Sequence, residues 1–347
     1  MKEIKIGNFT ISEESPTFII AEAGINHNGD FDTAVKMIKE AKECGANAVK
    51  FQTFKAEDLV IKNMEKLNYL KESVQEDLYD FFKKMELTEK EFQKLNEVAK
   101  EEGIIFLSTP FSFEAAEFLD KLGVPAFKIA SRDLTHLPFL EFLAKKKKPM
   151  ILSTGLANIG EVSEAVEKIK SAGNDKIILL QCTSTYPPED REINLRVIQT
   201  YNKIFDCISG FSDHSVGIEI PFAAVALGAK VIEKHFTLDK KMEGPDHRIS
   251  ADPVEFSFLV RGIRRIEEAL GSFNKIPTPS EVKARKLGRR SIVAKKDIKK
   301  GEIIKREFLD FKPPNLGIEP RDINLVVGQK ATKNIKEGEI ITWDKIY

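Results

Sequence analysis

Two histidines, His214 and His235, each close a short apolar run and are the best candidates for metal binding in this sequence. They end the segments Phe-Ser-Asp-His and Ile-Glu-Lys-His. Two imidazoles suit a borderline divalent cation, and a site with only two protein nitrogens keeps positions open for water and substrate. The alternative for either histidine alone is a hydrogen-bonded core residue. The pair at two run ends favours a metal site.

Two lysines, Lys50 and Lys128, interrupt apolar runs in the segments Ala-Val-Lys-Phe-Gln and Ala-Phe-Lys-Ile-Ala-Ser. A buried lysine is costly unless it meets an anion. Hydroxyl residues lie at the ends of other runs, namely Ser108, Thr109, Ser131, Ser153, Thr154 and Ser212. Lysine and hydroxyl donors together predict a binding site for phosphate and carboxylate groups. The alternative is that one lysine is a Schiff-base nucleophile.

Four carboxylates occur beside these groups. Glu22 ends the first apolar run, and Asp246 follows the last one in the segment Gly-Pro-Asp-His. Either could exchange protons with a metal-bound water or a substrate hydroxyl. Asp213 and Glu233 stand close before the two histidines, so orienting the imidazoles is an equally good interpretation for them.

The elements that must position these residues are eight apolar runs, each of which turns polar at its carboxyl end. They cover residues 18–22, 48–52, 104–109, 126–131, 150–154, 177–183, 208–214 and 231–235. Segments of helical period lie between them, and several stop at a glycine, as expected for left-handed caps before the chain re-enters a parallel sheet. This alternation predicts a (β/α)₈ TIM barrel, in which all strand ends converge on one site.

Segments outside the regular alternation define the predicted domains. Residues 1–17 alternate as a hairpin expected to cover the amino end of the barrel, and residues 54–85 add helical pattern expected to form a partial lid. The hairpin and barrel would occupy residues 1–271, followed by a linker over 272–287 without a clear period. Residues 288–347 carry an internal repeat, 296–304 and 333–341, that predicts a small, mainly β domain. About 60 residues are marginal for an independent core.

Composition excludes several classes of protein. Apolar residues make up 42% and charged residues 31%, and the formal net charge is +0. These values are ordinary for a soluble enzyme and give no field for holding nucleic acid. No apolar stretch has the length of a membrane helix or the form of a signal peptide. The three cysteines, Cys44, Cys182 and Cys207, cannot pair completely, which predicts reduced thiols in a cytoplasm.

The ordered motifs resemble the sialic acid synthase family, whose enzymes condense phosphoenolpyruvate with an N-acetylated hexosamine. The resemblance covers nearly the whole chain. It is carried by Ala21–Gly29 (AEAGINHNG), Lys50-Phe51-Gln52, Ser108–Phe111 (STPF), Lys128–Ser131 (KIAS), Leu152–Gly155 (LSTG), Cys182–Pro187 (CTSTYP), Gly210–Ser215 (GFSDHS), Glu233–Thr237 (EKHFT) and Gly244-Pro245-Asp246. The repeat-bearing end looks like the family's antifreeze-like (SAF) domain.

The resemblance implies a role for each candidate residue. His214 and His235 would bind Mn²⁺ or Mg²⁺. Phosphoenolpyruvate would be held by Lys50, Thr109, Lys128, Ser131, Ser153, Ser184 and Ser212. Catalysis at the sugar or the attacking water would involve Glu22, Gln52 and Asp246, with Tyr186, Asp133 and Arg289 on the sugar side. Family members are dimers in which one chain's SAF domain covers its partner's site, so a domain-swapped homodimer is expected.

Three departures from the family pattern concern the substrates. Arg132-Asp133 follows Ser131, where the family has a small or apolar residue and then Glu. Ser184 stands where an Asn is expected near phosphoenolpyruvate. Residues 312–317 read Lys-Pro-Pro-Asn-Leu-Gly, where the SAF domain normally offers an Arg-Pro to the N-acetyl group. The sugar could therefore differ from N-acetylmannosamine, or Arg132, Arg289 or Arg290 could compensate.

The sequence thus predicts a metal-dependent transferase that forms a carbon–carbon bond and yields a sialic-type nonulosonic acid and phosphate. A legionaminic or pseudaminic acid synthase acting on a diacetamido sugar is the alternative within the family. A Schiff-base aldolase using Lys50 or Lys128 is the alternative chemistry, and a binding scaffold without activity is a third. The sequence does not determine the acceptor sugar, its phosphorylation, or which of the two metals is bound.

Overall fold

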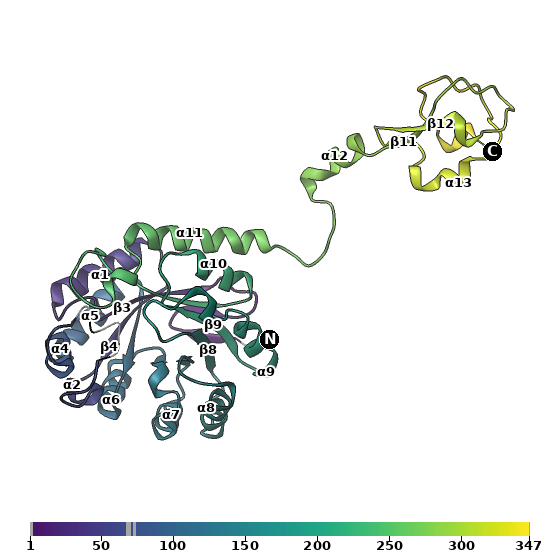
Figure 1. Ribbon diagram of the computed structural model, residues 1–347. Helices are drawn as coiled ribbons and strands as arrows, with labels where there is room; N and C mark the ends of the chain where they lie inside the picture. Colours follow the sequence, from purple (N-terminus) through teal and green to yellow (C-terminus); the bar gives the residue numbers. More distant parts are fainter. Residues whose placement is uncertain (1–2, 67–70, 72–73, 347) are drawn as a thin grey trace. The chain divides into compact units, whose positions relative to one another are not determined.

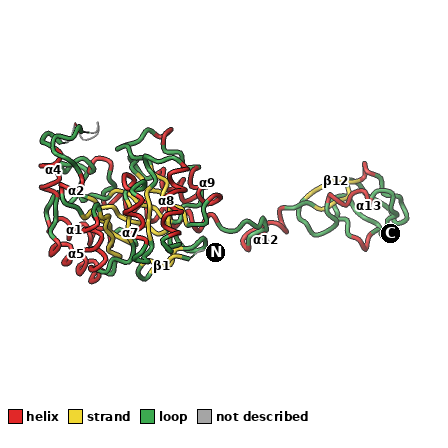
Figure 2. The backbone as a smooth tube through the Cα atoms, turned by 90° about the horizontal axis from the view of Figure 1, so that it is seen from below, coloured by secondary structure: helices red, strands yellow, loops and turns green. Residues whose placement is uncertain are grey.

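The computed structural model describes residues 3–66, 71 and 74–346 of the chain, in two compact units, Met1–Gly271 and Ser272–Tyr347. The first unit contains one eight-stranded sheet surrounded by helices (Figures 1 and 2). Its strands are β3 Phe18–Gly24, β4 Ala48–Thr53, β5 Ile105–Pro110, β6 Phe127–Ile129, β7 Met150–Ser153, β8 Ile177–Cys182, β9 Ile208–Asp213 and β10 Val231–His235.

The strand order is β5-β4-β3-β10-β9-β8-β7-β6, and hydrogen-bonded neighbours run parallel. Strands β5 and β6, at the two ends of this order, lie against each other and close the barrel. The predicted TIM barrel is therefore confirmed. Because its strands are parallel, all their carboxyl ends lie at one mouth of the barrel.

The helices of this unit follow the strands in sequence. They are α1 Phe31–Glu43, α2 Ala56–Leu59, α4 Leu78–Met85, α5 Glu89–Glu102, α6 Phe113–Leu122, α7 Leu137–Ala144, α8 Ile159–Ser171, α9 Val197–Ile204, α10 Glu219–Ala226 and α11 Pro253–Leu270. Local sequence sets their ends: α5 begins at a capping box formed by Thr88 and Glu91. It stops at Gly103, whose φ of 69° is left-handed. Buried helix faces such as Phe92, Leu95 and Ala99 pack on the outside of the sheet.

The amino-terminal hairpin pairs β1 Ile4–Ile6 with β2 Phe9–Ile11. Ile4, Ile6 and Ile11 share one apolar cluster with residues from the first half of the barrel strands, including Phe18 and Val231. The hairpin therefore covers the amino end of the barrel, as predicted. No helix in the described part of the chain is both long enough and apolar enough to cross a membrane.

The second unit is built on the internal repeat. Strand β11 Ser291–Ala294 pairs antiparallel with β12 Leu309–Lys312, and Ile298 of the first repeat bridges Ile335 of the second. Both isoleucines, together with Ile304 and Ile341, lie in the core of this unit, which also contains the short helix α13 Ile323–Val326. The two repeats thus pack against each other and supply much of one small core.

One helix in this region was not predicted. The predicted linker contains helix α12 Pro279–Gly288, which begins at a capping box formed by Thr278 and Glu281. None of the residues of α12 is buried, so the helix has no apolar stripe that periodicity could reveal. The capping signal, with proline at the first helical position, was the only sequence feature that indicated a helix here.

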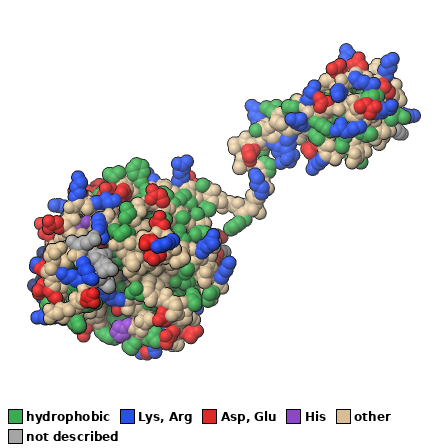
Figure 3. Space-filling model, viewed as in Figure 1, with side chains coloured by type: hydrophobic (Ala, Val, Ile, Leu, Met, Phe, Trp, Pro, Cys, Tyr) green, Lys and Arg blue, Asp and Glu red, His purple; other side chains and the backbone are tan. Residues whose placement is uncertain are grey.

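Charge is distributed unevenly along the sequence. Lys and Arg outnumber Asp and Glu in residues 272–347, so the rest of this neutral chain has the matching acidic excess. Basic side chains are frequent on the face of the second unit seen in Figure 3.

Residues 312–317, where the sequence departs from the Arg-Pro of the family's SAF domain, also lie in the second unit. The Ser291 hydroxyl holds this segment by donating to the Pro314 carbonyl at 2.6 Å and accepting from Leu316 and Gly317 amides at 3.0 Å.

Candidate active site

A cavity of about 300 Å³ lies at the carboxyl ends of the barrel strands. The residues predicted from the sequence that line it are Glu22, Lys50, Gln52, Thr109, Lys128, Ser131, Ser153, Ser184, Tyr186, Ser212, His214, His235 and Asp246. Residues from all eight strands or the loops that follow them therefore meet in one place.

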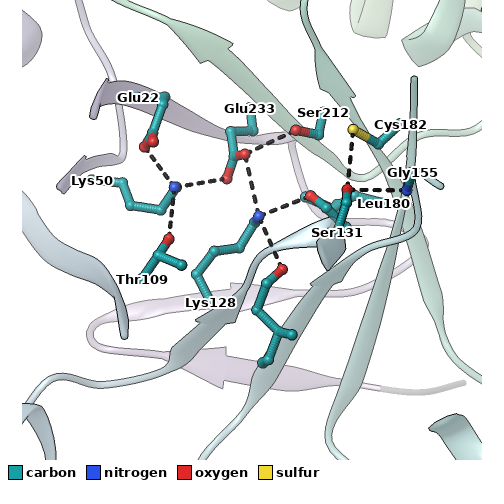
Figure 4. Close-up of polar contacts among 12 residues, drawn as sticks. Glu22, Lys50, Thr109, Lys128, Ser131, Gly155, Leu180, Cys182, Ser212 and Glu233 are labelled. Atoms are coloured by element: carbon teal, nitrogen blue, oxygen red, sulfur yellow. Dashed lines mark hydrogen bonds and ion pairs between the residues drawn. The ribbon is translucent and has the colours of Figure 1, made fainter. Parts of the chain in front are cut away.

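Two buried lysines and two buried glutamates form the floor of this cavity (Figure 4). Lys50 Nζ lies 2.6 Å from Glu22 Oε2 and 3.8 Å from Glu233 Oε2. Lys128 Nζ lies 3.4 Å from Glu233 Oε1, so Glu233 stands between the two ammonium groups. Pairing offsets the cost of burying these four charges.

Hydroxyl groups complete the floor. Lys50 Nζ donates to Thr109 Oγ1 at 3.0 Å, and Lys128 Nζ donates to Ser153 Oγ at 2.8 Å. The Ser131 hydroxyl accepts from the Gly155 backbone N–H at 3.1 Å. A Cβ at Gly155 would come within 2.2 Å of Ser184 Oγ, so only glycine allows this close approach. Ammonium, hydroxyl and amide donors thus surround one small space, as an anion requires.

Burial controls the charge of the floor residues. It raises the pKa of Glu22 to about 7, although Lys50 acts in the opposite direction. Burial also lowers the pKa of Lys128. For Glu233 the two lysines outweigh burial and lower its pKa, and for Lys50 the two glutamates outweigh burial and raise its pKa. Glu22 is consequently the floor carboxylate best placed to gain or lose a proton near neutral pH.

The two predicted metal ligands lie side by side at the ends of β9 and β10. The ring centroids of His214 and His235 are 5.3 Å apart, and the Tyr186 ring stacks on His214 at 4.0 Å. His214 Nδ1 lies 2.8 Å from the Thr183 carbonyl oxygen, which leaves its Nε2 for a ligand. His235 Nδ1 is buried and has no hydrogen-bond partner among the described residues. Asp246 Oδ2 lies 3.7 Å from it.

These two imidazoles fit a divalent ion. A buried ring nitrogen without a hydrogen-bond partner is costly unless something coordinates it. Burial, reinforced by the nearby charge of His214, holds the pKa of His235 well below its usual value, so the ring is neutral and can act as a ligand. Burial opposes charge on His214 too, but Cys182 and the Thr183 carbonyl raise its pKa. In the described parts of the chain, no group of three or more His, Cys, Asp or Glu could hold a metal ion. Water and substrate would complete the coordination.

The predicted hydroxyl donors Ser108 and Thr154 and the predicted sugar contact Asp133 are not among the described residues that line the cavity. Ser131 and Arg132, directly before Asp133, do belong to the lining. Strand β6 ends at Ile129, and a 3₁₀ turn over Ser131–Asp133 follows it, so the chain no longer alternates as a strand when it reaches Asp133. Arg289 belongs to the second unit, and its contact with sugar stays a prediction.

Sequence reasoning missed part of the lining. Glu233 was left open between a reactive carboxylate and a residue that orients a histidine, and its bonds to Lys128, Lys50 and Ser212 were not predicted. Its position two residues before His235 on a strand was the available signal, since alternate residues face the same side. Arg132, one of the three arginines expected to be able to compensate for the missing family arginine, does line the cavity. Cys182 was missed, and so was an apolar outer wall made of Ile25, Leu59, Phe82, Phe111, Leu156 and Pro245. Leu59 and Phe82 come from α2 and α4, so the predicted lid segment does reach the cavity.

Two family models match this sequence: the NeuB family over residues 37–275 and the SAF domain over residues 289–346. The chain belongs to the NeuB family. An uncharacterised protein of Methanocaldococcus jannaschii is 49% identical to this NeuB family member over 100% of this chain and 99% of its own length. The N,N′-diacetyllegionaminic acid synthase of Legionella pneumophila is 44% identical over 95% of this chain and 94% of its own.

A solved structure agrees with these sequence relatives. The crystal structure of N-acetylneuraminic acid synthetase from Leptospira borgpetersenii, in complex with citrate, has a TM-score of 0.75 and 40% identity. The match covers 82% of this chain and 95% of that chain. The predicted family is confirmed, and this NeuB family member is an enzyme of the sialic acid synthase type.

Proposed function

We propose that this NeuB family member condenses phosphoenolpyruvate with an N-acetylated hexosamine and water to give a sialic-type nonulosonic acid and phosphate. The observation that carries the proposal is one cavity that joins an anion-binding floor, built on Lys50 and Lys128, to the imidazoles of His214 and His235. The acceptor is N-acetylmannosamine or a close relative. The homodimer implied by the resemblance stays a prediction.

The floor residues would bind phosphoenolpyruvate. Its phosphate and carboxylate require several donors, which Lys50, Lys128 and the hydroxyls of Thr109, Ser153 and Ser131 supply. Both lysines already face carboxylates, so the bound anion would compete with Glu22 and Glu233 for the ammonium groups. Enclosure of these groups strengthens each electrostatic contact.

The histidine side of the cavity would receive the aldehyde of the open-chain sugar. A divalent ion held by His214 and His235 would polarise that aldehyde as a Lewis acid. Tyr186, stacked on His214, forms the wall next to this position. Asp246, whose pKa burial raises to about 6, lies close to His235 and faces the same space.

The proposed reaction is an aldol-like addition followed by hydration and loss of phosphate. The nucleophilic carbon of phosphoenolpyruvate forms a bond to the aldehyde carbon, and the aldehyde oxygen takes a proton. Water then adds to the cationic carbon C2, and Glu22 accepts one proton from that water. The new C2 hydroxyl becomes the ketone carbonyl as the carbon–oxygen bond to phosphate breaks, and its remaining proton leaves with the phosphate. Gln52 Nε2 lies 3.3 Å from Glu22 Oε1 and would orient this carboxylate.

The outer wall bears on which sugar is used. Leu59, Phe82, Phe111 and Leu156 offer apolar surface, which favours a deoxy sugar over one with a charged terminal phosphate. Arg132 also reaches the cavity, but its guanidinium already donates to the Leu59 carbonyl at 3.2 Å and lies over the Phe111 ring. The name of the Legionella relative points the same way. Within the proposed class, a diacetamido sugar leading to a legionaminic-type acid is the favoured acceptor.

The experiment that tests this function is phosphate release from phosphoenolpyruvate with Mn²⁺, measured with N-acetylmannosamine, its 6-phosphate and a diacetamido deoxy-hexose. We expect release that requires both a sugar and the metal, with the highest kcat/KM for the diacetamido sugar. EDTA should stop the reaction, and added Mn²⁺ should restore it. Sugar-independent release, or no release with any of the three, would contradict the proposal.

A different measurement tests the alternative of a Schiff-base aldolase. We expect borohydride with pyruvate to leave the protein mass unchanged, because Lys50 is paired with two glutamates that raise its pKa and keep it protonated. The test is most informative for Lys128, because burial lowers its pKa and so favours the neutral amine that a Schiff base requires. Intact-mass spectrometry before and after treatment gives the answer. A pyruvate adduct on Lys128, absent in Lys128→Met, would establish the aldolase instead.

A further inference from the structure

A buried ion pair lies behind the two histidines. Asp213 and Lys234 are cross-strand neighbours on β9 and β10, with Lys234 Nζ 2.7 Å from Asp213 Oδ2 and side chains that are 0% and 1% exposed. They face away from the cavity, because side chains alternate along a strand and their neighbours Ser212, Glu233 and His235 line it. Such pairs are often replaceable by apolar residues without loss of stability, so stability alone does not explain this one.

The ion pair holds both residues that flank His214. Asp213, immediately before it, accepts from the Ser215 backbone N–H at 2.9 Å and from its hydroxyl at 2.6 Å. Lys234 also donates to the Ser215 carbonyl. Since β9 ends at Asp213, the backbone of His214 lies beyond the ladder, and these contacts take the ladder's place. Lys234 directly precedes His235, so one ammonium group connects the two histidine positions.

The inner face of the same strands is also fixed. Ser212 Oγ donates to Glu233 Oε1 at 2.9 Å across the ladder, and each of these residues lies two positions before a histidine. The two strand ends are therefore joined on both faces. With two imidazoles as the protein ligands, the spacing of the metal site depends on where these backbones lie rather than on a third side chain.

We propose that Asp213, Ser215 and Lys234 form a clamp that sets the separation of His214 and His235, which makes Asp213 and Lys234 positioning residues for the divalent ion. This inference rests on the proposed function, because it takes the two histidines as ligands. Outer partners of metal ligands typically contribute about 10- to 100-fold in metal affinity. The clamp acts through backbone position and touches no substrate.

The test is the double variant Asp213→Asn with Lys234→Met, which removes both charges and leaves no unpaired one buried. Mn²⁺ binding to the full chain without substrates is measured by electron paramagnetic resonance, and thermal unfolding is followed on the metal-free protein. We expect the Mn²⁺ Kd to rise about 10- to 100-fold while the metal-free Tm changes little. The matched control is Lys240→Met with Glu255→Gln, which removes a half-exposed pair elsewhere on the barrel and should leave the Kd unchanged.

Each outcome separates the clamp from the proposed function. An unchanged Mn²⁺ Kd in the folded double variant would overturn the clamp alone, with the metal site intact. Absence of Mn²⁺ binding to the unaltered protein would overturn the metal site and the clamp together. Should the double variant not fold, Ser215→Ala removes only the hydroxyl bond to Asp213. We expect that variant to bind Mn²⁺ several-fold more weakly, and an unchanged Kd there would equally overturn the clamp.

Discussion

His235→Ala is expected to lower metal-dependent phosphate release by about 10³-fold or more, since a Lewis acid contributes several kcal/mol to such a step. The His235 ring is buried, its pKa is well below the usual value, and its Nδ1 has no hydrogen-bond partner in the described structure. Removing the ring takes away one of the two imidazoles at the cavity. Initial rates at saturating phosphoenolpyruvate, with Mn²⁺ binding measured on the same sample, are the readout.

The control for this variant is His136→Ala, which removes an exposed imidazole that does not belong to the cavity lining. We expect its rate and its Mn²⁺ affinity to match those of the unaltered protein. His214→Ala should behave as His235→Ala does. A folded His235→Ala variant that keeps the full rate and still needs Mn²⁺ would show that the ion binds elsewhere.

Glu22→Gln is expected to reduce kcat/KM by about 10²- to 10⁴-fold, the usual contribution of a general base. Burial raises the pKa of Glu22 to about 7, so the carboxyl is mostly protonated below that pH and ionised above it. A base must be ionised to accept the water proton, so kcat/KM of the unaltered enzyme should fall as the pH drops below about 7. The residual activity of Glu22→Gln should lack this acid limb.

The readout is kcat/KM over a pH series on both sides of 7, because this parameter reports groups of the free enzyme. Glu141→Gln is the matched control, since Glu141 is a surface carboxylate paired with Lys145 and Lys168. The Glu141→Gln variant should keep both the full rate and the acid limb of the pH profile. An acid limb that survives in Glu22→Gln would assign the titration to another group, with Asp246 the next candidate because its pKa is also raised.

The sequence was sufficient to predict the barrel because its signals are local. Apolar runs such as Ile177–Cys182 and glycine-terminated helices such as Glu89–Glu102 appear within single windows of the chain. Parallel closure then brings the strand ends together, so Lys50, Lys128 and His235 could be assigned to one site without knowing any distance. Helix α12 was not predicted because it has no buried face and therefore no helical period of apolar residues.

The rest of the site depends on contacts between distant strands. Glu233 lies between Lys50 and Lys128 only because β10, β4 and β6 face one another across the barrel interior, and no window of sequence contains that relation. Asp133 is a different case. Its assignment came from the family resemblance alone, and the 3₁₀ turn over Ser131–Asp133 leaves it outside the described lining of the cavity. The apolar outer wall could not be predicted from the sequence either, since its residues come from separate loops and helices.

The insertion after β4 has a consequence for how this enzyme could change over evolutionary time. Its residues Phe54, Val60, Val74, Leu78 and Phe81 form an apolar cluster separate from those of the barrel. Mutations at Leu59 or Phe82 therefore alter the wall against which the acceptor would lie without disturbing the packing beneath Lys50 and Lys128. Substitutions in this insertion can therefore change the acceptor preference while the bond-forming chemistry stays constant. Grafting the insertion between relatives is a direct route to redesigning the product.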